Sequence, residues 1–232
     1  MIVGNGQLAQ IFENQQLENA VIFASGVADS NCVEQKQFDR ERDLLISTLL
    51  ENPDKKFVYF SSCALSADEY PKNKYYQHKQ HMEEVIKNHT KNYYIFRIPQ
   101  LFGCLKKHKT LINFIYYSII NDKSFNLYSH AYRYVIEIND VLLLVQKYLE
   151  LSDSGIIIDL ANTYRYSVES IVKVLEELTS KKAKYNKIEK LDKYLLDLKN
   201  LNKFIKEHDL KLGFGKEYLM NHLNLRCNPP EN

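Results

Sequence analysis

The sequence predicts an α/β fold, a mostly parallel, twisted sheet with helices on both faces and a small carboxyl-side lobe. Three observations support this. The chain opens on a short apolar run, Met1-Ile2-Val3, that leads through a glycine turn into a helical pattern. Apolar runs of strand length then alternate with helical patterns, as in a series of βαβ units. The 232 residues are also enough for one sizeable core, or for a larger domain with a small lobe.

Composition argues against several classes of protein. A net charge of +2 and a pI near 8.2 do not indicate nucleic acid or a membrane surface as partner. The sequence lacks a charged leader and a long apolar span, so we expect a cytoplasmic protein without membrane association. The cysteines lack Cys-x-x-Cys or Cys/His ligand spacing, so we expect no metal and no disulfide framework. These cysteines are Cys32, Cys63, Cys104 and Cys227.

The glycine turn at the start of the chain is typical of a phosphate-binding loop. Gly4-Asn5-Gly6-Gln7-Leu8-Ala9 leads into a helix that we expect to reach about Leu17. Glycines let backbone amides approach a pyrophosphate, and a helix N-terminus adds a partial positive charge. The candidate cofactor-binding residues of this turn are Gly4, Gly6, Gln7 and Leu8.

Residues 57–79, FVYFSSCALSADEYPKNKYYQHK, hold the candidate catalytic residues. Ser62 follows a strand-like apolar run, and ligands of open α/β sheets bind at the carboxyl ends of strands. Tyr75 and Lys79 are one turn apart in an expected helix from about Tyr75 to Asn88, so their side chains share a face. An adjacent ammonium lowers the pKa of a tyrosine from its usual value of about 10. We therefore predict Tyr75 as general acid/base, Lys79 as the group that tunes it, and Ser62 as the group that holds the reacting oxygen.

These residues resemble motifs of the extended short-chain dehydrogenase/reductase superfamily, specifically its nucleotide-sugar epimerase/dehydratase branch, and within it the dTDP-4-dehydrorhamnose reductases. The serine pair followed by Tyr75-x-x-x-Lys79 is the first motif. Residues 97–103, RIPQLFG, and residues 133–141, RYVIEINDV, are similar to two further segments of that branch. Residues 155–162, GIIIDLAN, are similar to its late strand, which precedes a Ser-x-x-Glu helix start, here at Ser167.

The resemblance implies a Rossmann-like cofactor domain that binds NADP or NAD, without distinguishing the two. It adds Ala24, Ser25, Pro99 and Leu101 to the cofactor-binding residues, together with Tyr75 and Lys79, whose ammonium would hold the nicotinamide ribose. It implies a nucleotide-sugar substrate. The substrate-binding residues it implies are Ser62, Cys63, Tyr75, Thr110 and Arg133, the last of which would contact the diphosphate.

The expected strand Ala20–Gly26, followed by a helix from about Val33 to Leu50, has two interpretations. It is the second strand of the fold, so that Asp29 binds the adenosine ribose. Alternatively it is the fourth strand of the family, and the second and third strands are missing. We favour the missing strands, which require the first crossover helix to take an unusual position. The glycine turn is also one glycine short of the family's pattern, and Gln37 stands where the family often has a catalytic asparagine.

We expect the cofactor domain to comprise residues 1–107 and 131–162, and the substrate-binding lobe residues 108–130 and 163–232. Residues 105–128 are expected to form an aromatic-rich helical stretch. The lysines and leucines of the last fifty residues or so are expected to have helical spacing, with the lysines solvated. A homodimer is one option by analogy with the family. The partner-facing residues would be Gln80, Glu83, Glu84 and Lys87.

The function predicted from these observations is an NAD(P)H-dependent reductase of a nucleotide-activated keto-sugar in polysaccharide or glycan precursor biosynthesis. An epimerase or dehydratase must retain its dinucleotide between two half-reactions, for which a shortened cofactor domain is poorly suited. Two alternatives stay open at this point. One is such an epimerase or dehydratase, and the other is a non-catalytic sugar-nucleotide-binding module with a truncated cofactor site.

Overall fold

The computed structural model of the protein describes residues 1–67, 73–103, 105, 110–190 and 194–227. The chain forms two compact units. Unit 1 comprises Met1–Ile98 and Ile138–Leu160, and unit 2 comprises Pro99–Glu137 and Ala161–Asn232. None of the described helices is both long and apolar enough to cross a membrane.

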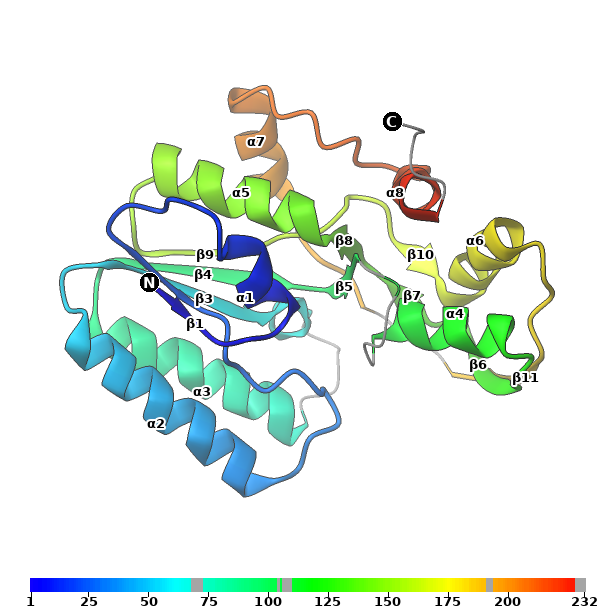
Figure 1. The fold of residues 1–232 in the computed structure, drawn as a ribbon, viewed down its shortest axis with the longest axis horizontal. Coiled ribbons are helices and arrows are strands. Elements are labelled where there is room, and N and C mark those ends of the chain that lie inside the picture. Colours follow the sequence, from blue (N-terminus) through cyan, green and yellow to red (C-terminus); the bar gives the residue numbers. More distant parts are fainter. Residues whose placement is uncertain (68–72, 104, 106–109, 191–193, 228–232) are drawn as a thin grey trace. The chain divides into compact units, whose positions relative to one another are not determined.

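Unit 1 is built on a five-stranded sheet in which every pair of neighbours is parallel. Its order is β1-β2-β3-β4-β9. The strands are β1 (Ile2–Val3), β2 (Ala20–Phe23), β3 (Lys56–Ser62), β4 (Tyr93–Ile98) and β9 (Ile156–Asp159). The predicted fold class, a mostly parallel sheet with helices on both faces, is confirmed (Figure 1).

The strand order decides between the two interpretations of β2. In a doubly wound sheet of order 3-2-1-4-5-6, the first strand lies between the second and the fourth. If β2 were the second strand, β1 would lie inside the sheet with a later strand on its other side. Instead β1 is the edge strand of the described sheet, and β2, β3 and β4 follow it in chain order. The interpretation with Asp29 as the ribose-binding acid of a second strand is wrong, and the described chain has no counterpart of the second and third strands.

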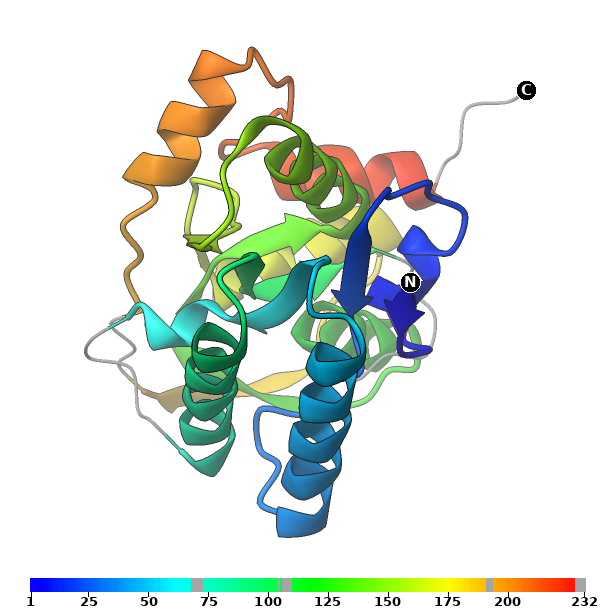
Figure 2. The ribbon, with the colours of Figure 1, turned by 90° about the vertical axis from the view of Figure 1, so that its left-hand side faces the viewer.

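Helices cover both faces of this sheet. Helices α2 (Gln35–Glu51) and α3 (Lys74–His89) contact each other on one face, side by side in Figure 2. Helices α1 (Gln7–Phe12) and α5 (Ile138–Leu151) contact each other on the opposite face. Alternate side chains of β3 define the two faces, because side chains of a strand point to opposite sides of a sheet. Tyr59 joins the core beneath α2 and α3, whereas the ring of Phe60 lies 5.9 Å from that of Phe12 in α1.

Helix α1 has the unusual position expected of it. The crossovers through α1, α2 and α3 each advance one strand in the same direction, yet α1 lies on the face opposite to α2 and α3. The first crossover therefore has the opposite hand from the next two. Parallel crossovers are right-handed in about 98% of cases, so the reversal needs a physical reason. Helix α1 lies on the face that it would occupy if a second strand flanked the outer edge of β1.

The predicted length of α1 is wrong, whereas that of α3 is confirmed. Helix α1 ends at Phe12 rather than near Leu17, because only Ala9 and Phe12 are buried and the polar residues after them continue as turns. Helix α3 matches its prediction within a residue at each end. It begins after Asn73, whose side chain accepts the backbone N–H of Tyr76 at 3.1 Å, an N-cap that fixes the start of the helix.

The described part of unit 2 combines three short strand pairs with four helices. The pairs are β5 (Gln100–Phe102) with β8 (Val135–Glu137), β6 (Phe125–Ser129) with β11 (Tyr185–Glu189), and β7 (Tyr132–Arg133) with β10 (Tyr166–Ser167). The helices are α4 (Leu111–Ile120), α6 (Val168–Thr179), α7 (Lys199–Glu207) and α8 (Tyr218–Cys227). Its core joins α4, β6, α6 and α8 through residues such as Ile115, Leu127, Ile171 and Leu219.

Two helical predictions in unit 2 are wrong in part. Of the described residues in the stretch 105–128, Leu111–Ile120 are helical and the end forms the strand β6, while residues 106–109 lie outside the described part of the chain. Residues 185–189, which were expected to have helical spacing, form β11 in parallel register with β6. Pairing between segments far apart in sequence overrides local spacing here. Helix α7 does follow the lysine and leucine spacing, with Leu201 and Phe204 buried and its lysines exposed.

Candidate active site

The predicted catalytic residues lie on adjoining elements of unit 1. Ser62 is the last residue of β3 and caps the short helix η1 (Cys63–Leu65), with its Oγ accepting the N–H of Ala64 at 3.3 Å. Tyr75 and Lys79 lie on α3, which contacts both β3 and η1. The Nζ of Lys79 is 5.8 Å from the centroid of the Tyr75 ring, so the two side chains do share a face of the helix.

Lys79 is held in the interior of unit 1, where only 2% of the residue is exposed. Its Nζ donates hydrogen bonds to Glu41 Oε1 and to the hydroxyl of Tyr59, both at 3.0 Å. The Tyr59 hydroxyl in turn donates to Glu41 Oε1 at 2.6 Å. A buried ammonium, a carboxylate and a phenol therefore form one closed set of short contacts.

The second carboxylate oxygen of Glu41 is also occupied. It accepts the backbone N–H of Val27 at 2.6 Å and lies 3.1 Å from Nε2 of His78, whose ring stacks on Phe38. Burial raises the pKa of Glu41, but the Lys79 ammonium and the donors His78, Tyr59 and Val27 together hold that pKa well below its ordinary value. Glu41 is thus an ionised carboxylate in the core. We refer to Glu41, Tyr59, His78 and Lys79 as the Glu41 cluster.

Gly26 is part of the wall around this cluster. A Cβ added at Gly26 would lie 2.5 Å from Nζ of Lys79 and 3.0 Å from Oε1 of Glu41. Both of those atoms are engaged in their mutual contact. The backbone at Gly26 therefore passes directly against the ion pair, and a larger residue there would have to displace it.

The electrostatics of Tyr75 differ from the prediction. Tyr75 is 8% exposed, and burial is the main reason that its pKa is raised rather than lowered. The Lys79 ammonium opposes this shift, while the carboxylates of Glu41 and Asp29 add to it. Lys79 thus acts in the predicted direction, but burial outweighs it, and the expected net lowering of the pKa of Tyr75 is wrong. The phenol is protonated at neutral pH.

The glycine turn has two positions with different steric roles. Gly4 has φ +128°, and a Cβ there would lie 2.5 Å from the carbonyl oxygen of Ala24, so this position accepts only glycine. Gly6, the N-cap of α1, has no atom within 4 Å of an added Cβ, so its backbone is open to a ligand. Gln7 and Leu8 begin α1 and are half-buried.

A cation that the sequence did not single out lies beside this turn. Nη1 and Nη2 of Arg40, on α2, donate to the hydroxyl and the carbonyl oxygen of Ser25 at 3.3 and 3.0 Å. The backbone N of Ser25 is in turn 3.0 Å from the Cβ position built at Gly4. Ser25 therefore contacts both the glycine turn and the exposed guanidinium of Arg40. The turn and Arg40 together provide backbone amides and a cation, the groups that bind phosphate oxygens.

Glu41 was missed because the sequence pointed to Gln37. Gln37 is exposed, and its amide donates to Glu34 at 2.7 Å, away from the Glu41 cluster. Glu41 is one helical turn further along α2, and it is Glu41 that contacts Lys79. A signal for it exists in the sequence. Glu41 stands in the apolar stripe of α2 between Phe38 and Leu45, where an acid needs a buried partner.

A second group of buried or half-buried polar contacts connects α3 to the sheet. Arg97 of β4 makes a bidentate ion pair with Glu83 of α3, at 2.9 and 2.7 Å, and its third contact is the hydroxyl of Ser66 at 2.9 Å. Ser66 also donates to Asp159 at 2.8 Å. Glu83 is buried, so its prediction as a partner-facing residue is wrong.

The other predicted site residues are placed as follows. Cys63 is fully buried and its thiol donates to the carbonyl oxygen of Arg97 at 3.0 Å, so contact with a substrate would first require this bond to open.

Unit 2 carries the remaining four predicted site residues. Pro99 and Leu101 flank Gln100 at β5, the Thr110 side chain caps α4, and half-buried Arg133 lies on β7, where its Nη1 donates to the carbonyl oxygen of Tyr132 at 2.6 Å. Their predicted roles stay predictions.

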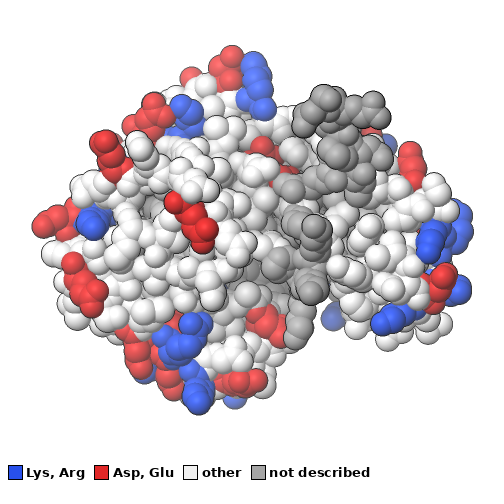
Figure 3. All heavy atoms as spheres, viewed as in Figure 1, with Lys and Arg blue, Asp and Glu red and all other residues white. Residues whose placement is uncertain are grey.

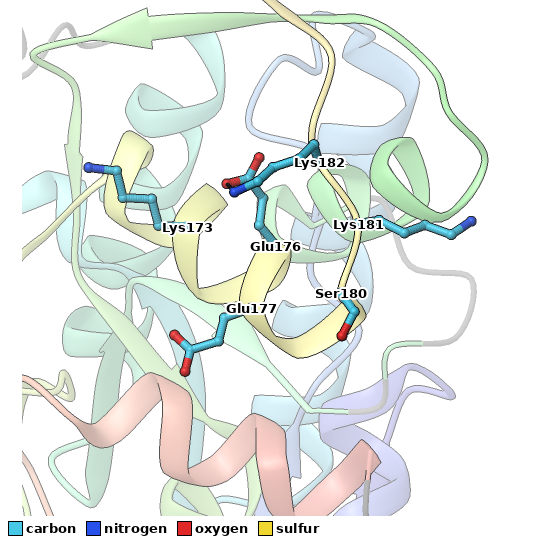
Figure 4. Close-up of a pocket in the computed structure, with 6 residues that line it drawn as sticks. All are labelled: Lys173, Glu176, Glu177, Ser180, Lys181 and Lys182. Carbon is cyan, nitrogen blue, oxygen red and sulfur yellow. Dashed lines mark hydrogen bonds and ion pairs between the residues drawn. The ribbon is translucent and has the colours of Figure 1, made fainter.

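A hollow of about 610 Å³ in unit 2 contains none of the predicted residues (Figure 4). It lies at the end of α6 and is lined by Lys173, Glu176, Glu177, Ser180, Lys181 and Lys182. Its Glu176 accepts the N–H of Ala183 at 2.8 Å and pairs with Lys182. The hollow therefore has mixed charges, and acidic and basic side chains are likewise interspersed on the face of the molecule drawn in Figure 3. We assign it no function.

Neither a protein-family model nor a curated protein matches the chain. Solved structures do match. UDP-glucuronic acid 4-epimerase from Bacillus cereus, in complex with UDP-glucuronic acid and NAD, has a TM-score of 0.74 at 15% identity, over 97% of this chain and 78% of that one. dTDP-glucose 4,6-dehydratase from Bacillus anthracis, in complex with NAD, has a TM-score of 0.71 at 14% identity, over 97% and 76%.

A reductase is also among the matches. dTDP-4-dehydrorhamnose reductase from Bacillus anthracis, in complex with NADP, has a TM-score of 0.66 at 15% identity, over 80% of this chain and 74% of that one. At these identities the likeness concerns the fold. The resemblance stated from the motifs is confirmed at that level, and the chain has the Rossmann-like fold shared by the nucleotide-sugar epimerases, dehydratases and reductases of the short-chain dehydrogenase/reductase type.

Proposed function

We propose that the protein is a cytoplasmic NAD(P)H-dependent reductase of a nucleotide-activated keto-sugar. The observation that carries this proposal is the placement of Tyr75 and Lys79 on one face of α3, against the carboxyl end of the strand that Ser62 terminates. A phenol, an ammonium and a hydroxyl on adjoining elements at this edge of a parallel sheet are the groups that protonate and orient a carbonyl oxygen.

The residues of unit 1 fit a dinucleotide. The Gly4–Gly6 turn offers open backbone at Gly6 and a close approach at Gly4, and Arg40 adds a cation beside it. Lys79 has three donors, and its contacts with Glu41 and Tyr59 among the described residues use two of them, so we assign the third to a ribose hydroxyl. When bound, the reduced nicotinamide supplies a hydride to the carbonyl carbon.

The chain's own residues supply the rest of the reaction. Tyr75 donates its phenolic proton to the carbonyl oxygen, and Ser62 donates a hydrogen bond that orients this oxygen. In unit 2 we assign Arg133 to the diphosphate of the substrate, because a planar guanidinium binds phosphate oxygens two at a time. Pro99 and Leu101 are assigned to the nicotinamide and Thr110 to the sugar nucleotide.

We favour a reductase over an epimerase or dehydratase because of the short sheet. An enzyme that first oxidises and then reduces its substrate must retain the dinucleotide between the two steps. The described sheet ends at the two-residue strand β1, without the two strands that would cover the adenosine half. A cofactor that binds and leaves once per turnover is compatible with such a reduced binding surface.

The test begins with the cofactor. NADH and NADPH are titrated into the purified protein by calorimetry, and a panel of keto-sugar nucleotides is then assayed by following NADPH oxidation. Binding and turnover of one panel member support the proposal. Binding of neither cofactor at millimolar concentration would contradict it and favour a sugar-nucleotide-binding module. Interconversion of two sugar nucleotides without net oxidation of the cofactor would identify an epimerase.

A further inference from the structure

The Glu41 cluster gives Lys79 a partner that the predicted chemistry does not use. Lys79 and Glu41 are 2% and 0% exposed, and their charged atoms are 3.0 Å apart. Because water is largely excluded there, each charge is stabilised mainly by the other. Neighbouring groups also hold the pair in position. Gly26 blocks one side of Nζ, and the Tyr59 hydroxyl bonds to both charged groups.

This arrangement changes what Lys79 does to its neighbour. An uncompensated ammonium within about 4 to 6 Å lowers the pKa of a phenol by about one to three units, which favours the phenolate. A phenolate is the form that takes a proton from a hydroxyl. When a carboxylate faces the ammonium, it opposes this influence, and the buried phenol keeps its proton. A protonated phenol is the form that gives a proton to a carbonyl.

We propose that Glu41 is a positioning residue that neutralises the Lys79 ammonium and so keeps the Tyr75 phenol protonated, setting the site for proton donation. This inference rests on the proposed reductase function and deepens it, because it assigns a direction to the chemistry. Glu41 touches neither Tyr75 nor a reacting atom in this arrangement; it acts through Lys79 and through its own charge.

Among the described residues, the charged and titratable groups around Tyr75 come from four segments of unit 1. Lys79 belongs to the same helix, Glu41 to α2, Tyr59 to β3, and Asp29 to the loop after β2. His78 and Glu83 act at one remove, the first on Glu41 and the second on Tyr59. Glu41 and Asp29 both oppose the effect of the ammonium on Tyr75, and Glu41 is in direct contact with Lys79.

The experiment is a direct titration of Tyr75 in the free protein. Tyrosine labelled with ¹³C at Cζ is followed by NMR against pH, and the Tyr75 signal among the 17 tyrosines is assigned from the spectrum of Tyr75→Phe. Glu41→Gln removes the negative charge and keeps the shape, so Tyr75 should titrate at least about one unit lower, with about tenfold more phenolate at a given pH. Glu41→Asp, which keeps the charge, should titrate like the wild type.

A double variant keeps the test decisive if Glu41→Gln does not fold. Glu41→Gln with Lys79→Met replaces a neutral pair by two neutral side chains, a change that buried pairs often tolerate. If Glu41 compensates Lys79, Tyr75 titrates in this variant within about one unit of the wild type. A rise of more than that would show that Lys79 acts as an uncompensated cation, and would overturn the proposal. An unchanged titration in a folded Glu41→Gln variant would overturn it as well.

This titration needs neither cofactor nor substrate. Its failure is therefore distinguishable from failure of the proposed function, which is tested by cofactor binding. A protein that binds NADPH but shows no effect of Glu41 on Tyr75 retains the reductase proposal and loses this inference. A protein that shows the effect but binds neither NADH nor NADPH retains the charge compensation and loses the reductase.

Discussion

The carboxylate of Glu41 lies 3.0 Å from the ammonium of Lys79 in the interior of unit 1. The two residues are 38 positions apart in the sequence, and their contact joins two helices. Glu41 comes from α2 and Lys79 from α3. The residue proposed to tune the catalytic tyrosine is thus also a structural contact. The stability of unit 1 and its proposed chemistry therefore depend on the same pair of residues.

Replacement of Tyr75 by Phe should lower turnover by about two orders of magnitude, because it removes the proton donor. Ring packing is kept, so thermal unfolding should change little. The measurement is NADPH oxidation with the best substrate of the sugar-nucleotide panel. Tyr76→Phe is the matched control, since Tyr76 is the next residue and equally buried at 8% exposure. An equal loss in both variants would point to packing rather than to proton transfer.

Glu41 should make the stability of the protein depend on pH in the acid range. Its pKa in the folded state lies below the ordinary value of 4.5, so it contributes stability that is present above that value and is lost as the pH falls below it. Urea unfolding between about pH 7 and pH 3 should show this loss. Glu41→Gln should be less stable by about 3 to 5 kcal/mol at neutral pH, because it leaves Lys79 unpaired.

The control for that measurement is how steeply the free energy of unfolding changes with pH. Below about pH 4.5 this free energy should change less with pH in Glu41→Gln than in the wild type, because the titrating group is gone. An equal pH dependence in the two proteins would assign the acid sensitivity to other carboxylates.

Gly26→Ala should destabilise unit 1, because the added Cβ would lie 2.5 Å from Nζ of Lys79. The ion pair must shift to make room, at a cost of about 1 to 3 kcal/mol for overpacking. Chemical denaturation measures the loss. Gly6→Ala serves as the comparison, since nothing lies within 4 Å of its Cβ and its φ of −79° suits any residue. Equal stability of the two variants would contradict the tight fit at Gly26.

Arg40→Gln should weaken NAD(P)H binding by about 1.5 to 3 kcal/mol, the range for a hydrogen bond to a charged group. The reason is the position of its guanidinium, which bonds Ser25 beside the glycine turn. Calorimetric titration measures the change. Arg42→Gln is the control, because Arg42 lies on the same helix but pairs with Asp39 and Asp43. Identical affinity in Arg40→Gln and the wild type would remove Arg40 from the phosphate site.

Arg133→Lys should weaken binding of the sugar nucleotide, also by about 1.5 to 3 kcal/mol, because lysine keeps the charge but loses the bidentate fork. Cofactor affinity should hardly change and acts as the internal control. Both affinities are measured by calorimetry on the same preparation. Weaker NAD(P)H binding with unchanged sugar-nucleotide binding would mean that the two phosphate sites are assigned the wrong way round.

The sequence by itself determined the elements of unit 1 and the candidates Ser62, Tyr75 and Lys79. These are local properties. Apolar runs of strand length mark the strands, one helical turn separates the phenol from the ammonium, and a cap at Asn73 starts α3 close to the predicted residue. The absence of two strands was also foreseeable, because the resemblance of residues 20–29 to a later segment of the fold is a matter of sequence.

Tertiary structure decided the contacts, the burial and the pKa values of these residues. No local pattern pairs Glu41 with Lys79, brings Gly26 against their charges, or gives β11 its partner β6, because each of these contacts joins segments that are distant in the chain. Burial then reversed the expected shift in the pKa of Tyr75. The strength of a charge depends on the dielectric and the counter-charges around it, and both are fixed only when the sheet and its helices have packed.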